Sequence, residues 1–219
     1  MPKFLGFSAA LLFLLTSGFT YAADSAANAT LQFKLDFEGS NPSRYEITVA
    51  SDGHGTYTSN GELGDSASPD SAALEFTLSD GTRKNLFDLA KRSKYFAGKV
   101  DSGNKKIANT GAKTLSYKDG SHQTSATYNY SPNPSIQQIT EIFQNLSTTL
   151  EYGRRLSWFH KYQKLALDND LSQMQDRVRS NTLGDVEAIA PVLQAIVDDP
   201  SVMNISREKA MRLLAFASK

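Results

Sequence analysis

The chain of 219 residues carries 23 Lys and Arg side chains against 23 Asp and Glu side chains, and it contains no cysteine. The missing cysteines exclude disulfides, thiolate metal sites and a cysteine nucleophile. Because the positive charges are scattered among negative ones instead of forming a basic face, the composition also argues against a nucleic-acid partner.

Residues 1–23 have the pattern of a cleavable export signal. Lys3 precedes an apolar run over residues 4–15, and small residues follow at 20–23. The apolar run is too short to span a bilayer comfortably. We expect cleavage after Ala22, which would give a secreted or periplasmic protein without a stable membrane anchor. An uncleaved anchor or a buried helix is the alternative interpretation.

Alternating apolar and polar residues predict four strands after the signal. Residues 31–37 give the clearest pattern, since every second side chain is apolar and the others are charged or carry an amide. Further strands are expected at residues 45–49, 55–59 and 74–78. The first two of these flank an Asp-Gly turn, which predicts a hairpin.

The apolar period changes to that of a helix beyond residue 82. Leu86, Leu89 and Ala90 form the apolar stripe of a short helix, for which Thr82 is the predicted N-cap. Residues 98–111 are rich in Gly, Asn, Ser and Lys, which indicates a long exposed loop.

A second hairpin is expected after this loop. Its strands are predicted at residues 112–118 and 121–130, on either side of the two-residue turn Asp119-Gly120.

A long helix is predicted to begin at Asn133 and Pro134, which suit the cap and first-turn positions. Its apolar residues form a narrow seam that fits a helix lying on the sheet; they are Ile136, Ile139, Phe143, Leu146 and Leu150. The register changes near Gly153. One bent helix to about Ser180 and two helices hinged near Gly153 both fit. We favour a break or a protrusion, because a straight helix would be roughly 70 Å long, which is too long for one face of a compact domain.

The C-terminal part, residues 185–217, predicts a helical hairpin in which Pro191 fits a helix start or a kink. The motif residues Pro191-Val192-Leu193, Asp198-Asp199-Pro200, Arg207, Ala210 and Leu213-Leu214 resemble a single helical unit of the HEAT-repeat kind. Since such units stack on one another, the resemblance implies a helical interaction surface.

The order of elements up to Leu150 resembles that of uncharacterised secreted bacterial α+β domains. Those domains begin with a strand like residues 43–49, followed by an Asp-Gly turn and an aromatic strand, here Asp52-Gly53 and Tyr57. Some of them carry a cysteine before the first hairpin, which this chain lacks. The resemblance covers about half of the chain and implies a fold without implying a catalytic residue.

Motifs that carry chemistry are missing from the sequence. His54, His122 and His160 are not spaced to hold a metal or to orient a base. Residues 168–170 look like the start of a calcium loop, but Gln173 stands where that loop requires glycine. The nucleophile elbow, the phosphate loop and the dinucleotide fingerprint are also absent. We therefore predict no catalytic residue, no metal ligand and no cofactor.

A group of aromatic and basic residues in the long helix is the predicted partner-binding surface. Its members are Tyr152, Arg155, Trp158, Phe159 and Tyr162. Trp, Tyr and Arg dominate the energetics of protein interfaces. The alternative interpretation is that aromatic residues at helical spacing pack into a core.

Together these patterns predict an α+β protein with an antiparallel sheet of five or six strands covered by helices over residues 31–150, and a helical C-terminal extension over residues 151–219. The leading hypothesis is an exported, non-catalytic binding or scaffold module of the cell envelope or exterior, with a protein partner on the C-terminal helices. A hydrolase of an unrecognised family would instead need a concave pocket with perturbed titratable groups. A secreted inhibitor-like module would need a well-ordered loop at 98–111.

Overall fold

The computed structural model describes residues 29–61, 63 and 73–217. The predicted export signal at residues 1–23 lies outside the described residues, so cleavage after Ala22 stays a prediction.

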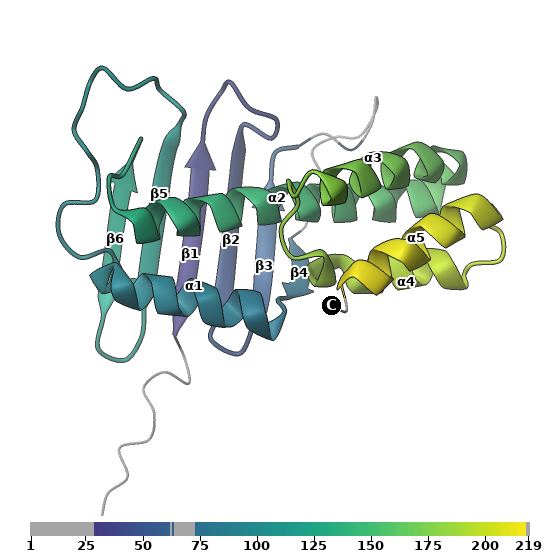
Figure 1. The fold of residues 1–219 in the computed structure, drawn as a ribbon, viewed down its shortest axis with the longest axis horizontal. Coiled ribbons are helices and arrows are strands. Elements are labelled where there is room, and N and C mark those ends of the chain that lie inside the picture. Colours follow the sequence, from purple (N-terminus) through teal and green to yellow (C-terminus); the bar gives the residue numbers. More distant parts are fainter. Residues whose placement is uncertain (1–28, 62, 64–72, 218–219) are drawn as a thin grey trace, which may run out of the picture.

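Six antiparallel strands form one sheet in the order β4-β3-β2-β1-β5-β6, which confirms the predicted α+β class (Figure 1). The strands are β1 (Thr30–Asp36), β2 (Arg44–Ala50), β3 (His54–Ser59), β4 (Leu74–Thr77), β5 (Ala112–Lys118) and β6 (Gln123–Tyr128). In the central register Phe33 lies opposite Ile47 on one side and Leu115 on the other. All three side chains are buried, so the alternation seen in the sequence puts one apolar face of the sheet into the core.

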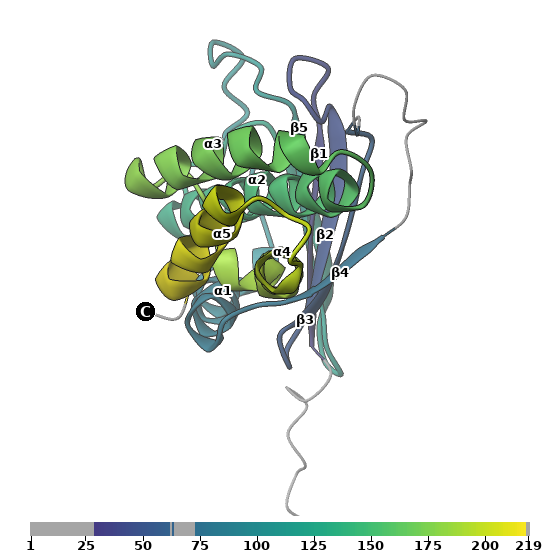
Figure 2. The same ribbon diagram turned by 90° about the vertical axis from the view of Figure 1, so that its right-hand side faces the viewer.

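The helices that the structure describes all lie on the side of this apolar face (Figure 2). Those that cover it are α1 (Asp80–Arg92), which leads into the short η2 (Lys94–Phe96), and the first half of α2 (Pro134–Tyr162). Phe143 of α2 stacks on Phe33 of β1, with the ring centroids 5.2 Å apart. The opposite face of the sheet is polar, and no helix among the described residues covers it.

The first helix begins one turn earlier than predicted. Ser79 is the N-cap of α1, and its side chain accepts a hydrogen bond from the backbone N–H of Thr82. Thr82 as the N-cap was therefore wrong. The Asp80-Gly81 pair had the appearance of a turn, but a capping serine before it allows both residues to join the helix.

The long helix α2 runs without a break for 29 residues and passes straight through Gly153. At 1.5 Å per residue it is about 43 Å long. A Cβ atom at Gly153 would lie 2.6 Å from Cγ2 of Ile189, so the glycine permits close packing rather than bending. The predicted break near Gly153 was wrong, because the helix ends at Tyr162 and the chain turns at Gln163.

The remaining helices pack around the second half of α2, beside the edge strand β4 (Figure 1). They are η3 (Lys164–Ala166), α3 (Leu167–Arg179), η4 (Val186–Ile189), α4 (Ala190–Asp198) and α5 (Asn204–Ala217). The hairpin predicted at residues 185–217 is formed by α4 and α5, and Pro191 lies in the first turn of α4. None of the helices among the described residues has both the length and the apolarity that crossing a bilayer requires.

Two regions of the molecule thus share α2: the sheet region (residues 29–150) and the helical region (residues 151–217). One continuous hydrophobic core joins them, and it includes Phe33 of the sheet region and Leu213 of the helical region.

Candidate functional site

The five predicted partner-binding residues all lie on the second half of α2, but they do not form one surface. Trp158 and Phe159 are half-buried, whereas Tyr162 is 60% exposed. The ring of Trp158 contacts both of the others, with centroids 5.4 Å from Phe159 and 5.5 Å from Tyr162. These three residues form an accessible aromatic edge at the end of the helix.

The other two predicted residues turn towards α3. Tyr152 is buried, and the guanidinium carbon of Arg155 lies 4.4 Å from the centroid of its ring. Arg155 also forms an ion pair with the buried Asp170, with 2.8 Å between Nε and Oδ2. Tyr152 and Arg155 therefore belong to the joint between α2 and α3 and not to the aromatic edge.

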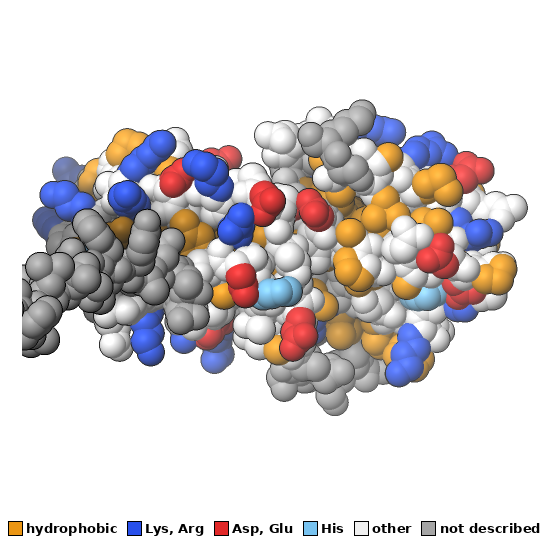
Figure 3. Space-filling model, turned by 90° about the horizontal axis from the view of Figure 1, so that it is seen from below, with side chains coloured by type: hydrophobic (Ala, Val, Ile, Leu, Met, Phe, Trp, Pro, Cys, Tyr) orange, Lys and Arg blue, Asp and Glu red, His pale blue; other side chains and the backbone are white. Residues whose placement is uncertain are grey.

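Large exposed apolar side chains are concentrated in the helical region. The described residues include seven of them, and six lie between residues 162 and 216, namely Tyr162, Leu165, Met203, Ile205, Met211 and Phe216; the seventh is Tyr130. Seen from below, hydrophobic side chains also gather over the half of the molecule that holds α4 and α5 (Figure 3). Exposed apolar side chains that gather in one region of the surface are typical of an interaction site.

Helix α5 carries apolar side chains on both of its faces. Ala210 and Leu213 are buried against the rest of the helical region, while Ile205, Met211 and Phe216 project from the exposed side. A helix that only covers a core is polar on its outer side. The outer side of α5 therefore has more apolar area than the fold itself uses.

A buried polar network, which the sequence did not predict, fixes β3 to α2. Oε1 of Glu151 accepts hydrogen bonds from the Tyr57 hydroxyl at 2.7 Å, from Nη1 of Arg154 at 2.9 Å and from the Ser59 hydroxyl. Burial, together with the nearby charge of Glu151, raises the pKa of Tyr57 well above its ordinary value. Since the donors that converge on Glu151 come from the protein itself, we assign the network a structural role.

A second polar cluster ties the end of α2 to the turn between α4 and α5. Oδ2 of Asp199 lies 2.6 Å from Nζ of Lys164 and 2.8 Å from Nε2 of His160. Oδ1 of the same carboxylate accepts a hydrogen bond from the Ser201 hydroxyl at 2.6 Å. Lys164 is the largest of the influences that lower the pKa of Asp199. Nζ of Lys164 also donates to the hydroxyl oxygen of Ser201. All three partners converge on the carboxylate of Asp199, so we assign this cluster the role of a structural link.

The loop predicted at 98–111 is held at both ends. Oδ1 of Asp101 accepts from the backbone N–H of Asn129 at 3.1 Å, and Oδ1 of Asn129 accepts from the N–H of Thr110 at 2.9 Å. The buried Nζ of Lys113 adds hydrogen bonds to the carbonyls of Thr110 and Asn129, and burial lowers the pKa of this lysine. Residues 103–106 between these anchors are exposed.

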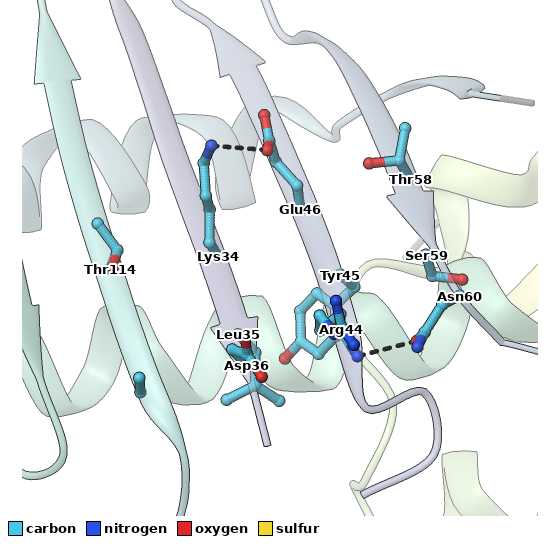
Figure 4. Close-up of a pocket in the computed structure, with 11 residues that line it drawn as sticks. Lys34, Leu35, Asp36, Arg44, Tyr45, Glu46, Thr58, Ser59, Asn60 and Thr114 are labelled. Atoms are coloured by element: carbon cyan, nitrogen blue, oxygen red, sulfur yellow. Dashed lines mark hydrogen bonds and ion pairs between the residues drawn. The ribbon is translucent and has the colours of Figure 1, made fainter. Parts of the chain in front are cut away.

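A wide polar hollow of about 750 Å³ lies across the ends of β1, β2, β3 and β5 (Figure 4). Lys34 and Glu46 pair at 2.8 Å in this hollow, and the side-chain oxygen of Asn60 accepts from the backbone N–H of Arg44 at 2.9 Å. The two basic residues of the hollow, Lys34 and Arg44, are matched in number by Asp36 and Glu46, so its formal charges cancel.

A smaller hollow of about 340 Å³ lies where the loop at residues 40–42 meets α2 and α3. Tyr152 and Arg155 line it together with Tyr45 and Arg177. Burial raises the pKa of Tyr45 to about 12. Sequence reasoning missed Arg177, which is 22 residues from Arg155 in the chain and reaches the site only because α3 folds back along α2.

Among the described residues, no group of three or more His, Cys, Asp or Glu side chains is placed to hold a metal ion. No protein-family model matches this chain, and no curated protein matches it either.

Proposed function

We propose that the protein is an exported, non-catalytic binding or scaffold module whose helical region contacts another protein. The observation that carries this proposal is the placement of six of the seven large exposed apolar side chains in the helical region. The expected export rests on the sequence pattern of residues 1–23.

The contact would be centred on the outer side of α5. Burying Ile205, Met211 and Phe216 under a partner would remove apolar area from water, which is the main favourable term in protein association. The α4–α5 hairpin is the segment that resembles a HEAT unit, and such units expose apolar faces where a neighbour stacks. The partner is therefore expected to present an apolar helical surface.

The inhibitor-like alternative has one specific observation in its favour. The loop at 98–111 is anchored at both ends by hydrogen bonds to residues near the end of β6, while residues 103–106 stay exposed. A loop that is held in shape loses little entropy when it enters a partner's cleft.

Site-specific photo-crosslinking in the native cell separates these hypotheses. A photoreactive side chain replaces Met211 on α5, Lys105 in the loop, or Thr56 on the exposed sheet face. We expect a discrete protein adduct from position 211 and none from position 56. An adduct from position 105 alone would favour the inhibitor-like module, and adducts of equal yield from all three would contradict a defined surface.

A charge on the exposed part of α5 provides the loss-of-function arm. Met211→Asp should abolish the adduct formed by a photoreactive group at Phe216, because it puts a charge into an apolar contact. Since Met211 is 55% exposed, the free energy of unfolding should change by less than about 0.5 kcal/mol. In contrast, Leu213→Ala on the buried side of α5 should cost about 2–5 kcal/mol.

A further inference from the structure

The hollow between the loop at residues 40–42, α2 and α3 has the size and the walls of a small-molecule site. Its volume of about 340 Å³ falls at the lower end of the range for ligand pockets. The loop wall is fixed, because the Ser40 hydroxyl lies within hydrogen-bond distance of the carbonyls of Phe37 (3.0 Å) and Pro42 (2.8 Å). The opposite walls are two helices.

Two arginines of this hollow keep their terminal nitrogens free. Nε of Arg155 donates to Oδ2 of Asp170 at 2.8 Å, and Nε of Arg177 donates to the hydroxyl oxygen of Tyr152 at 3.1 Å. No residue that the structure describes accepts a hydrogen bond from the Nη groups of either arginine. Each side chain is thus fixed through Nε. The Nη nitrogens, which usually donate hydrogen bonds to carboxylates and phosphates, are available for a ligand.

The charges around the hollow leave one positive charge uncompensated. Arg155 is paired with Asp170, and Glu151 is paired with Arg154. Arg177 forms no ion pair within the part of the chain that the structure describes. An anion is the ligand that such a balance favours.

Neutral groups add directed hydrogen bonds. The Tyr152 hydroxyl accepts from Arg177, and none of the described residues accepts its own proton, so it is a further donor in a buried position. Gln144 and Gln173 also line the hollow, and their side-chain amides make no hydrogen bond with described residues. These amides would contact the polar remainder of a ligand.

We infer that this hollow binds a small polar molecule through a carboxylate or phosphate group, held between Arg155 and Arg177 with the Tyr152 hydroxyl as a third donor. This site is separate from the apolar contact on α5 and does not depend on it. It gives Tyr152 and Arg155 a role in ligand binding instead of a place in a protein interface.

Titration of the full chain with anions, followed by two-dimensional NMR, tests the inference. The probes are inorganic phosphate and succinate, which separate a phosphate ligand from a carboxylate ligand. We expect saturable shifts of the Nε–H signals of Arg155 and Arg177 with at least one probe, at a Kd of about 1 mM or lower. The probe that binds more tightly identifies the class of the ligand.

Three variants assign the binding to this hollow. Arg177→Gln should raise the Kd at least tenfold, because it removes the uncompensated charge. Tyr152→Phe should raise it a few-fold, since it keeps the ring under Arg155 and removes only the hydroxyl. Arg179→Gln should leave the Kd unchanged, because Arg179 lies on the same helix but pairs on the surface with Asp176.

Two results would overturn the inference. One is the absence of saturable binding of either probe to the wild-type chain. The other is an equal loss of binding in the Arg177 and Arg179 variants, which would indicate a general attraction of anions to α3. Far-UV circular dichroism and thermal unfolding verify that each variant is folded.

Discussion

The sheet region and the helical region complete their burial in different ways. In the sheet region apolar and polar side chains alternate along each strand, and Tyr130 is the one large apolar side chain among its described residues that is strongly exposed. The helical region instead leaves six such side chains in water, although it buries Leu171, Leu193 and Leu213 completely or nearly so. The helices α1 and α2 cover the apolar face of the sheet region, whereas the helical region exposes apolar side chains that its own packing does not cover, and the proposed partner contact rests on these.

Helix α2 makes this comparison possible because it belongs to both regions. Its first half packs on the sheet through Phe143, and its second half packs against α3 and the segment with Ile189. The boundary between the regions is therefore not a linker. Substitutions at this boundary test whether the two regions fold as one unit.

The largest effect is expected from Glu151→Ala, which removes the centre of the polar network between the regions. Tyr57 and Ser59 lose their acceptor, and Arg154 loses a carboxylate partner in a buried site. Breaking a buried ion pair by deleting one partner costs about 3–5 kcal/mol. Urea unfolding should show this loss both by far-UV circular dichroism and by fluorescence of Trp158, the single tryptophan of the chain.

Glu75→Ala is the matched control, since Glu75 is exposed on β4, and its effect should stay within about 0.5 kcal/mol. A loss below 1 kcal/mol for Glu151→Ala would show that the network does not hold the regions together. If circular dichroism and Trp158 fluorescence gave separate transitions, the regions would be independent folding units.

Local patterns in the sequence predicted the sheet well and the helical region less well. Strand alternation is a local signal, so the strands and the hairpin after Lys118 could be located from the sequence alone. The two-residue turn predicted at Asp119-Gly120 was wrong, because Lys118 pairs with Gln123 and residues 119–122 connect the strands. The path of α2 through Gly153 could not be predicted from the sequence. The glycine is needed because the side chain of Ile189, which is distant in the chain, packs closely against it. A glycine at a hinge and a glycine under a neighbouring helix look the same in a sequence.

The same limit applies to the candidate sites: the sequence predicts contacts between neighbours on one helix, but not contacts that form only on folding. The aromatic edge at residues 158–162 could be predicted because its members are neighbours on one helix. The anion-binding hollow joins Arg155 to Arg177 and to the loop at residues 40–42, which meet only after folding. The network around Glu151 has one local signal, an acidic and a basic residue three positions apart in one helix, but its partners Tyr57 and Ser59 lie far away in the chain.

Gly153→Ala tests whether this glycine is needed for close packing between α2 and Ile189. Overpacking and helix propensity change the free energy of unfolding in opposite directions, so the sign of the measured change distinguishes them. The added Cβ would lie 2.6 Å from Cγ2 of Ile189, and such overpacking costs typically about 1–3 kcal/mol. The higher helix propensity of alanine offsets up to about 1 kcal/mol of this. We expect a net destabilisation of about 1–2 kcal/mol in urea unfolding.

A stabilising Gly153→Ala would contradict the packing role, because only a loosely packed glycine gains from helix propensity alone. The double variant with Ile189→Ala separates the contributions. Removing the side chain that the new Cβ meets should make the combined cost smaller than the sum of the two single costs.

The smallest effect concerns Asp119, in the hairpin between β5 and β6, at the opposite end of the sheet from β4. The backbone N–H of Ser121 is the largest influence, followed by His122, and together they lower the pKa of Asp119 to about 2. Since its pKa in an unfolded chain is about 3.9, the carboxylate stabilises the fold above about pH 4, and this contribution is lost as the pH falls towards 2.

Carboxyl NMR should therefore give a midpoint near 2, and Asp119→Asn should remove this part of the acid dependence of stability. The Trp158 signal of the folded protein should not change over the Asp119 titration, because the hydrogen-bond partners of the Asp119 side chain, Tyr117, Ser121 and His122, all belong to the same hairpin. A midpoint near 4 would show that the hydrogen bonds from Ser121 and His122 do not hold the carboxylate, and a parallel change at Trp158 would show that even the far hairpin is coupled to the helical region.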